Sequence, residues 1–171
     1  FRVSQSAEYI TDNAPVADYY ESNTPFFLGL GEGGAQGHIH RPVWAEGVGS
    51  SAAALNYVYR CIYQRLSRQS DKNIRVLDLG CGVGTGLRYL SQRLPISAAG
   101  ITISQSQATR ARNLNQLEGL SSIQIDCADF TVKNLRQSDW MYAIESLVHA
   151  SKLETVLMNV SNSLSPGGYL V

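Results

Sequence analysis

The chain has 171 residues, and its 14 lysine and arginine side chains balance 14 aspartates and glutamates, so the formal net charge is zero. This length predicts about one domain with a sizeable core. The absence of any block of like charge argues against nucleic acid or an anionic membrane as the main partner. No stretch approaches the ~20 consecutive apolar residues of a membrane span. Cys61, Cys81 and Cys127 are odd in number and widely separated, which favours free thiols in a reducing, cytoplasmic compartment.

Residues 1–49 predict an N-terminal cap without a long hydrophobic period. We expect one or two short helices at about 14–29, then a Gly-rich loop over 29–37 followed by His38 and His40. The cap is rich in aromatic side chains: Tyr19, Tyr20, Phe26, Phe27 and Trp44. Aromatic residues between glycines suit a lid over an apolar ligand, but they are equally suited to packing within the cap. The two histidines lack a carboxylate or cysteine placed to complete a metal site, so we predict no metal.

Residues 50–171 predict one α/β domain in which strands and helices alternate. The expected strands are 74–79, 96–103, 122–127 and 140–145, and the expected helices are 51–68, 85–94, 105–118 and 152–164. Such alternation is typical of a parallel sheet covered by helices on both faces. Ligands of these sheets bind beyond the carboxyl ends of the strands, where the strand order reverses.

The C-terminal residues predict a turn at 165–168 and then the start of a fifth strand at Tyr169. A domain rarely ends one or two residues into a buried strand, because the backbone groups of that strand would be left unpaired. We therefore expect a domain that is truncated after the start of its fifth strand.

The strand predicted at 74–79 turns abruptly into a helix through Gly80-Cys81-Gly82-Val83-Gly84. A dinucleotide-binding turn would need a third glycine where Thr85 stands, and no Gly-Lys-Ser/Thr of a phosphate-binding loop follows. Glycines that serve only to pack a strand against a helix are the structural alternative. The pattern Asp78-x-Gly80-x-Gly82-x-Gly84 resembles motif I of the class I S-adenosylmethionine-dependent methyltransferases. This resemblance implies a Rossmann-like fold and places S-adenosylmethionine against Asp78, Gly80, Cys81, Gly82 and Gly84.

The second predicted strand ends in Gly100-Ile-Thr102-Ile-Ser104, and Gln107 follows. Many class I methyltransferases carry an acid at this strand end, and this chain does not. The sequence instead resembles the Gly-x-Thr-x-Ser-x-x-Gln variant of cyclopropane fatty acid synthase and related carbon methyltransferases. That resemblance implies that Thr102, Ser104 and Gln107 contact the adenosyl part of the cofactor. The alternative is that Ser104 only caps the next helix and Gln107 lies on its surface.

The third predicted strand is followed by Asp129-Phe130, which resembles the family's motif II. The resemblance implies that Asp129 accepts a hydrogen bond from the adenine amino group and that Phe130 covers the ring. Asp126 is a second candidate, but taking Ile123 and Ile125 as inward-facing strand residues places Asp129 in the loop beyond the strand. A turn aspartate without a ligand is the structural alternative.

The fourth predicted strand ends in Tyr-Ala-Ile-Glu145-Ser-Leu-Val-His149-Ala, which closely resembles a segment of the sterol carbon-24 methyltransferases. Methylation of an alkene creates a carbocation, so Glu145 would stabilise the charge and Glu145 or His149 would remove a proton. Tyr19 or Tyr20 would face the cation. In an O- or N-methyltransferase, Glu145 and His149 would instead orient or deprotonate a hydroxyl or an amine. Hydrogen bonds of Glu145 and His149 to nearby backbone are the structural alternative.

Together these patterns predict a methyltransferase that transfers a methyl group from S-adenosylmethionine to carbon of a small, apolar natural-product or isoprenoid acceptor. The alternatives are an O- or N-methyltransferase of a natural product and a module that binds S-adenosylmethionine without turnover. A nicotinamide-dependent enzyme is a more distant alternative. The expected partner is the small-molecule acceptor, and the sequence leaves the oligomeric state, including a homo-oligomer, open.

Overall fold

A computed structural model gives the structure of the protein and describes residues 13–29, 37–69, 73–131 and 134–171. Most of the Gly-rich loop predicted at 29–37 lies outside these residues. Five parallel strands form one sheet in the order β3-β2-β1-β4-β5. The strands are β1 (Ile74–Leu79), β2 (Ile96–Thr102), β3 (Gln124–Cys127), β4 (Ser138–Tyr142) and β5 (Leu164–Leu170). The predicted parallel, Rossmann-like sheet is thereby confirmed.

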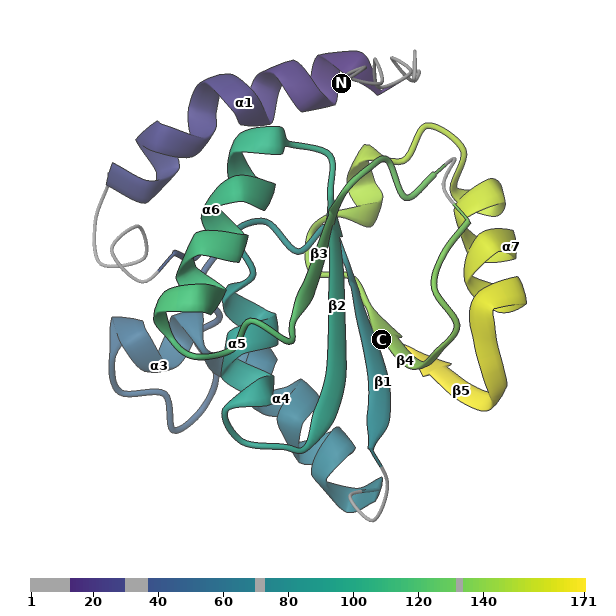
Figure 1. Ribbon diagram of the computed structural model, residues 1–171. Coiled ribbons are helices and arrows are strands. Elements are labelled where there is room, and N and C mark those ends of the chain that lie inside the picture. Colours follow the sequence, from purple (N-terminus) through teal and green to yellow (C-terminus); the bar gives the residue numbers. More distant parts are fainter. Residues whose placement is uncertain (1–12, 30–36, 70–72, 132–133) are drawn as a thin grey trace.

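Helices cover both faces of the sheet, as Figure 1 shows. Successive residues of β1 point to opposite faces, so Val76 packs with one core cluster and Leu77 with the other. On the Val76 side lie α4 (Tyr57–Leu66), α5 (Thr85–Ser91) and α6 (Gln105–Leu117), and α7 (Leu153–Ser163) lies on the Leu77 side. Because both faces are covered, β1 carries apolar residues on both of its faces.

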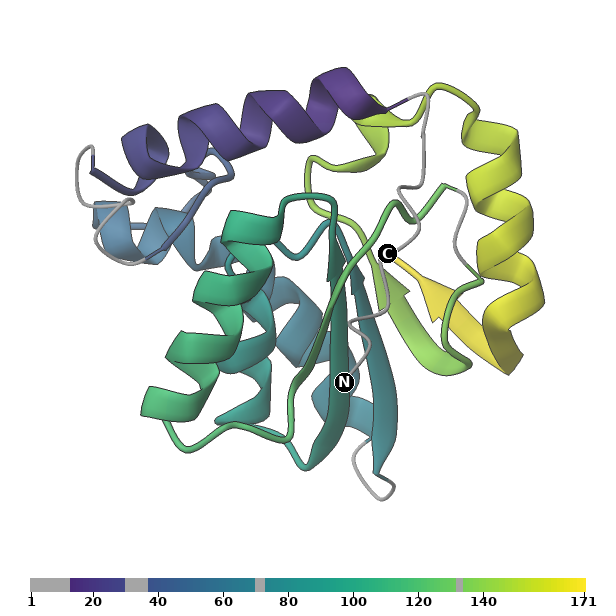
Figure 2. The ribbon, with the colours of Figure 1, turned by 45° about the horizontal axis from the view of Figure 1, so that its top comes forward.

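Helix α1 (Ala14–Gly29) lies across the carboxyl ends of the central strands, beside the N-terminal end of α6 (Figure 2). Sequence position alone would leave this helix far from the third strand, yet Asn13 at its start contacts Asp129 beyond β3. The predicted helix at 14–29 therefore forms, and it covers the carboxyl ends of the strands, where ligands of this fold bind. No helix in the described part of the chain is long and apolar enough to cross a membrane.

Several elements differ in extent from the predictions, and α5 (Thr85–Ser91) and β3 (Gln124–Cys127) are shorter than expected. The helix expected at 51–68 is broken at Asn56 into α3 (Ser51–Leu55) and α4, with a 3₁₀ turn, η1 (Ser67–Gln69), at its end. Strand β4 ends at Tyr142 because the chain then turns through Glu145, which has a left-handed φ of 53°. Strand β5 begins at Leu164, immediately after α7, rather than at Tyr169, and a register irregularity accommodates its early residues beside β4.

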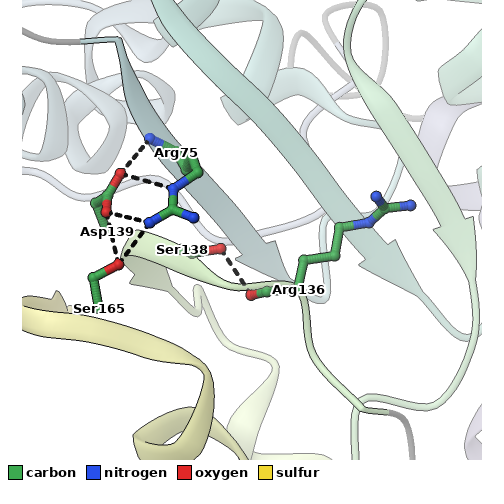
Figure 3. Close-up of polar contacts among 5 residues, drawn as sticks. All are labelled: Arg75, Arg136, Ser138, Asp139 and Ser165. Carbon is green, nitrogen blue, oxygen red and sulfur yellow. Dashed lines mark hydrogen bonds and ion pairs between the residues drawn. The ribbon is translucent and has the colours of Figure 1, made fainter.

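A charged contact joins three strands at the edge of the sheet opposite α1 (Figure 3). The Arg75 guanidinium on β1 donates to both carboxylate oxygens of Asp139 on β4, at 3.2 and 2.8 Å. Ser165 on β5 donates to Asp139 at 2.8 Å and accepts from Arg75 at 2.7 Å. Through these bonds Arg75 holds the pKa of Asp139 well below its usual range. The contact therefore favours folding as long as Asp139 is ionised.

We expect Asp139→Asn to lower the midpoint of thermal unfolding by a few degrees at pH 7. The folded-state pKa of Asp139 is depressed, so its stabilisation is present above the unfolded pKa of about 4 and is lost as the pH falls further. The difference between wild type and variant in circular-dichroism melts should therefore shrink between about pH 5 and about pH 2. Glu46→Gln, which removes one charge from an exposed turn, is the control. A difference that is constant with pH would contradict this assignment.

Candidate functional site

A cavity of about 600 Å³ lies beneath α1 at the carboxyl ends of β1, β2, β3 and β4. Most of the predicted site residues line it, and they come from five separate sequence segments: Tyr20, Asp78, Gly80, Cys81, Gly82, Thr102, Gln107, Asp129, Phe130, Glu145 and His149. Gly84 and Ser104 are not among the lining residues. The cavity size is typical of a site for a small molecule or cofactor.

The glycine turn after β1 forms the floor of this cavity. The N–H groups of Gly80 and Cys81 both donate to the carbonyl of Ile101 on β2, at 2.9 and 2.8 Å. Gly80 has φ of 88°, and a Cβ atom built on it would lie 2.3 Å from Cβ of Ser146. The hydroxyl of Ser146 in turn donates to the carbonyl of Leu79. Only glycine fits Gly80, because both its backbone angle and its surroundings exclude a side chain.

Gly84 and Ser104 stand at the starts of α5 and α6. Gly84, with φ of 78°, precedes α5, and a Cβ atom on it would lie 3.2 Å from Arg88 Nη1 and 3.4 Å from Cβ of Ala111. Ser104 is fully buried and caps α6, where its hydroxyl accepts from the N–H of Gln107 at 3.2 Å. Both residues shape the helices whose first turns border the cavity.

Asp78 is a buried acid at the end of β1, with 4% of its surface exposed. Burial raises the pKa of Asp78 to about 7, although the nearby Tyr142 hydroxyl acts in the opposite direction. A carboxylate in such surroundings is stabilised when a positively charged group binds beside it. Asp78 thus makes this end of the cavity suited to a cationic ligand group.

Thr102 and Gln107 meet at the end of β2. The Thr102 hydroxyl donates to Oε1 of Gln107 at 2.7 Å, and Nε2 of Gln107 donates to the hydroxyl of Thr24 on α1 at 3.0 Å. Gln107 is only 3% exposed, so it is not the surface residue of the structural alternative.

Of the two candidate acids near β3, Asp129 is the one at the cavity. Its carboxylate accepts from the N–H of Thr131 at 2.8 Å and from the side-chain amide of Asn13 at 2.9 Å. Asp126 lies within β3 and forms an ion pair with Arg136 at 3.3 Å. Phe130 lies beside Asp129 in the cavity wall.

Glu145 and His149 stand on the opposite wall, beyond β4. Oε1 of Glu145 accepts from the backbone N–H of Arg41 at 3.3 Å. Nε2 of His149, at the end of the 3₁₀ turn η2 (Leu147–His149), lies 2.9 Å from the Tyr20 hydroxyl on α1. Burial raises the pKa of Tyr20, and Tyr19 and Glu145 act in the same direction. Tyr20 is therefore protonated at neutral pH, and its hydroxyl either donates to Nε2 of His149 or accepts from it, according to the tautomer of the imidazole.

Several cavity residues were not named by the sequence reasoning, among them Asn13 and Arg41. Asn13 precedes Ala14-Pro15, which is a recognisable helix start, but nothing in the sequence names its partner. His38 and His40 lie against each other with Nδ1 and Nε2 3.3 Å apart. Burial lowers the pKa of His38 to about 4, and His40 and Arg88 act in the same direction. No cluster of three or more possible metal-ligating side chains occurs within the described residues.

Comparison with known proteins places the chain among methyltransferases. Residues 76–168 match a family model described as "Methyltransferase domain". The chain is 36% identical over 106 residues to 24-methylenesterol C-methyltransferase 2 of Oryza sativa subsp. japonica, covering 60% of this chain and 29% of that protein. It is 27% identical over 160 residues to Methyltransferase GfsG of Streptomyces halstedii, covering 91% of this chain and 55% of that protein. This chain thus spans less than a third of the first relative and about half of the second.

A solved structure is similar over nearly the whole chain. The crystal structure of the [4+2]-cyclase SpnF superimposes with a TM-score of 0.83 at 26% identity, covering 94% of this chain and 59% of that one. The likeness therefore includes α1 as well as the sheet.

The close contact at Gly80 gives a test of the turn geometry. We expect Gly80→Ala to lower the free energy of unfolding by about 2–4 kcal/mol, because the new Cβ would collide with Ser146 and strain the backbone. Gly119→Ala is the matched control: Gly119 also has positive φ, 70°, but nothing lies within 4 Å of its Cβ position, so about 1 kcal/mol is expected. Urea unfolding measures both. Equal losses would show that Ser146 does not restrict the turn.

Proposed function

The chain belongs to the methyltransferase domain family, and from this membership we propose that it binds S-adenosylmethionine and methylates carbon in a small, apolar acceptor of natural-product or isoprenoid type. One observation carries the proposal: the polar residues at the ends of β1, β2, β3 and β4 line a single cavity. The parallel sheet brings these strand ends together, and the polar side chains that they present to one shared cavity are what support a ligand site.

The residues of the cavity fit the proposed cofactor. Asp78 is a buried acid that a cationic ammonium group would stabilise. Thr102 and Gln107 offer a hydroxyl and an amide at the position suited to the ribose. Asp129 is a carboxylate acceptor suited to the adenine amino group, and Phe130 beside it offers an apolar surface to the ring. When bound, the cofactor supplies a methyl group already activated as a sulfonium.

The protein then has to position the acceptor and exclude water. Tyr19, Tyr20 and Phe27 of α1 present aromatic surface to the cavity. An alkene that gains a methyl group becomes a carbocation, and Glu145 stands at this wall to stabilise it. Glu145 or His149 would then accept the proton whose departure restores the double bond. The likeness to a sterol carbon methyltransferase over 60% of the chain supports this choice of acceptor.

One contact favours a second candidate, methylation of a hydroxyl. The Tyr20 hydroxyl lies 2.9 Å from Nε2 of His149, so proton transfer between an acceptor hydroxyl, Tyr20 and His149 has a short path. In this alternative, His149 is the general base and Glu145 orients the acceptor.

The cofactor is tested first, by calorimetric titration with S-adenosylhomocysteine and, separately, NAD. We expect micromolar binding of S-adenosylhomocysteine and none of NAD. Asp129→Asn should weaken binding at least tenfold because its amide can present a donor to the adenine amino group. Asp126→Asn removes an acid three residues away and outside the cavity wall, so it should change affinity by less than about twofold. No binding by the wild type would refute the proposed function.

The acceptor atom is tested with Glu145→Gln and His149→Gln. If methylation occurs at carbon, Glu145→Gln should lower kcat by about 10²-fold on prenyl and sterol-like alkenes, since a neutral amide stabilises a cation poorly. S-adenosylhomocysteine formation measures the rate. Near-full activity of Glu145→Gln, together with loss of activity on phenols in His149→Gln, would replace the carbon assignment with methylation of oxygen.

A further inference from the structure

Polar contacts, rather than an apolar face, hold α1 over the cavity. Within α1, every residue of which is described, Thr24 alone is buried, with 3% of its surface exposed. The large aromatic residue Phe26 is 61% exposed. Just before the helix, Asn13 is 7% exposed. The two buried polar side chains, one toward each end of α1, therefore determine much of its placement.

The contact at Thr24 has a defined direction. A hydroxyl carries one hydrogen, and that of Thr24 is donated to the carbonyl of Tyr20 at 2.5 Å. Towards Gln107, 3.0 Å away, Thr24 can then act only as an acceptor. The Gln107 amide must turn its nitrogen to Thr24, and its oxygen consequently faces the other way, towards β2.

This orientation decides the behaviour of Thr102. Oε1 of Gln107 lies 2.7 Å from the Thr102 hydroxyl and carries no hydrogen, so Thr102 has to donate its own. The Thr102 hydroxyl also accepts from the N–H of Ser104 at 3.4 Å. It can then offer only its remaining lone pair to a ligand in the cavity that it lines. Three residues on three elements thus form one directional series, in which a threonine of α1 makes a threonine of β2 an acceptor.

Asn13 has a parallel position at the other end of α1. Its amide donates to Oδ2 of Asp129 at 2.9 Å, while the N–H of Thr131 donates to Oδ1 at 2.8 Å. Two donors, one on each oxygen, hold the plane of the carboxylate. A carboxylate has about four lone-pair sites, so Asp129 keeps room to accept from a ligand as well.

We propose that Thr24 and Asn13 are positioning residues for the cofactor. Thr24 acts through Gln107 to make Thr102 an acceptor for a ribose hydroxyl, and Asn13 holds Asp129 as an acceptor for the adenine amino group. The proposal rests on the proposed function, since it concerns the same cavity. It implies that the placement of α1 and the binding of the adenosyl group are energetically coupled, each favouring the other.

Thr24→Val tests the series at its origin, because valine keeps the shape and removes the hydroxyl. With the Gln107 amide free to turn, we expect the affinity for S-adenosylhomocysteine to fall about tenfold by calorimetry. Thr24→Ser keeps the hydroxyl and should restore affinity to within about twofold. Ser22→Ala, at an exposed position of α1, is the control and should bind as wild type does. Wild-type affinity in Thr24→Val would overturn the role of Thr24.

A double-mutant cycle distinguishes positioning from simple loss of packing. If Thr24 acts through Thr102, then Thr24→Val should have almost no further effect on affinity in a Thr102→Val background. Losses that multiply would show that Thr24 acts by another route. Thermal unfolding of each variant without ligand reports separately on the stability of the fold.

Asn13→Ala gives a second test that does not depend on Thr24. Wild type should prefer S-adenosylhomocysteine over S-inosylhomocysteine, whose carbonyl replaces the amino group that Asp129 accepts from. We expect Asn13→Ala to reduce this preference by about tenfold, because Asp129 is no longer held. An unchanged preference would overturn the role of Asn13. If wild type binds neither compound, the proposed function itself is refuted. If wild type binds S-adenosylhomocysteine and the variants bind it equally well, only the positioning roles are refuted.

Discussion

The turn after β1 is the constraint on which the rest of the site depends. Gly80, Gly82 and Gly84 all have left-handed φ angles, of 88°, 54° and 78°, and no other residue type adopts three such angles within five positions without strain. The turn is tied to β2 by two N–H groups that share the carbonyl of Ile101. Strands β2 and β4 lie on opposite sides of β1, so the strand order reverses at β1. The cavity opens directly above the turn at this point.

Much of the sheet and many of the cavity residues follow from local sequence pattern. Strand β1 coincides with its predicted range because it is a mostly apolar run that ends at a glycine. Asp129 could be preferred over Asp126 because strand alternation places one acid in β3 and the other beyond it. Local pattern does not reveal which way a turn residue faces. Gly84 belongs to the same motif as Gly80, yet packs against Arg88 and Ala111.

The placement of α1 could not be predicted, because its partners are remote. Asn13 and Asp129 are 116 residues apart in sequence, and Thr24 and Gln107 are 83 apart. An apolar stripe along a helix predicts which of its faces is buried. Helix α1 is held by single polar side chains, which in the sequence look like ordinary surface residues. The left-handed φ of Glu145 could not be predicted from the sequence either. It is imposed by the path of the chain from β4 to η2 and not by a preference of glutamate.

The charges around the cavity discriminate between classes of cofactor. Asp78, Asp129 and Glu145 all line it, and among the described lining residues Arg41 is the only lysine or arginine. A dinucleotide would bring two negatively charged phosphates towards these acids. The single arginine at the cavity wall would have to offset the resulting electrostatic repulsion. A sulfonium or an ammonium group would instead lower the free energy of the acids, above all of Asp78, whose ionised form is disfavoured by burial. The same acidic surroundings would stabilise positive charge that develops on an acceptor carbon. The acids at the ends of three different strands therefore create one negative electrostatic environment. That environment suits both a cationic cofactor and a cationic intermediate.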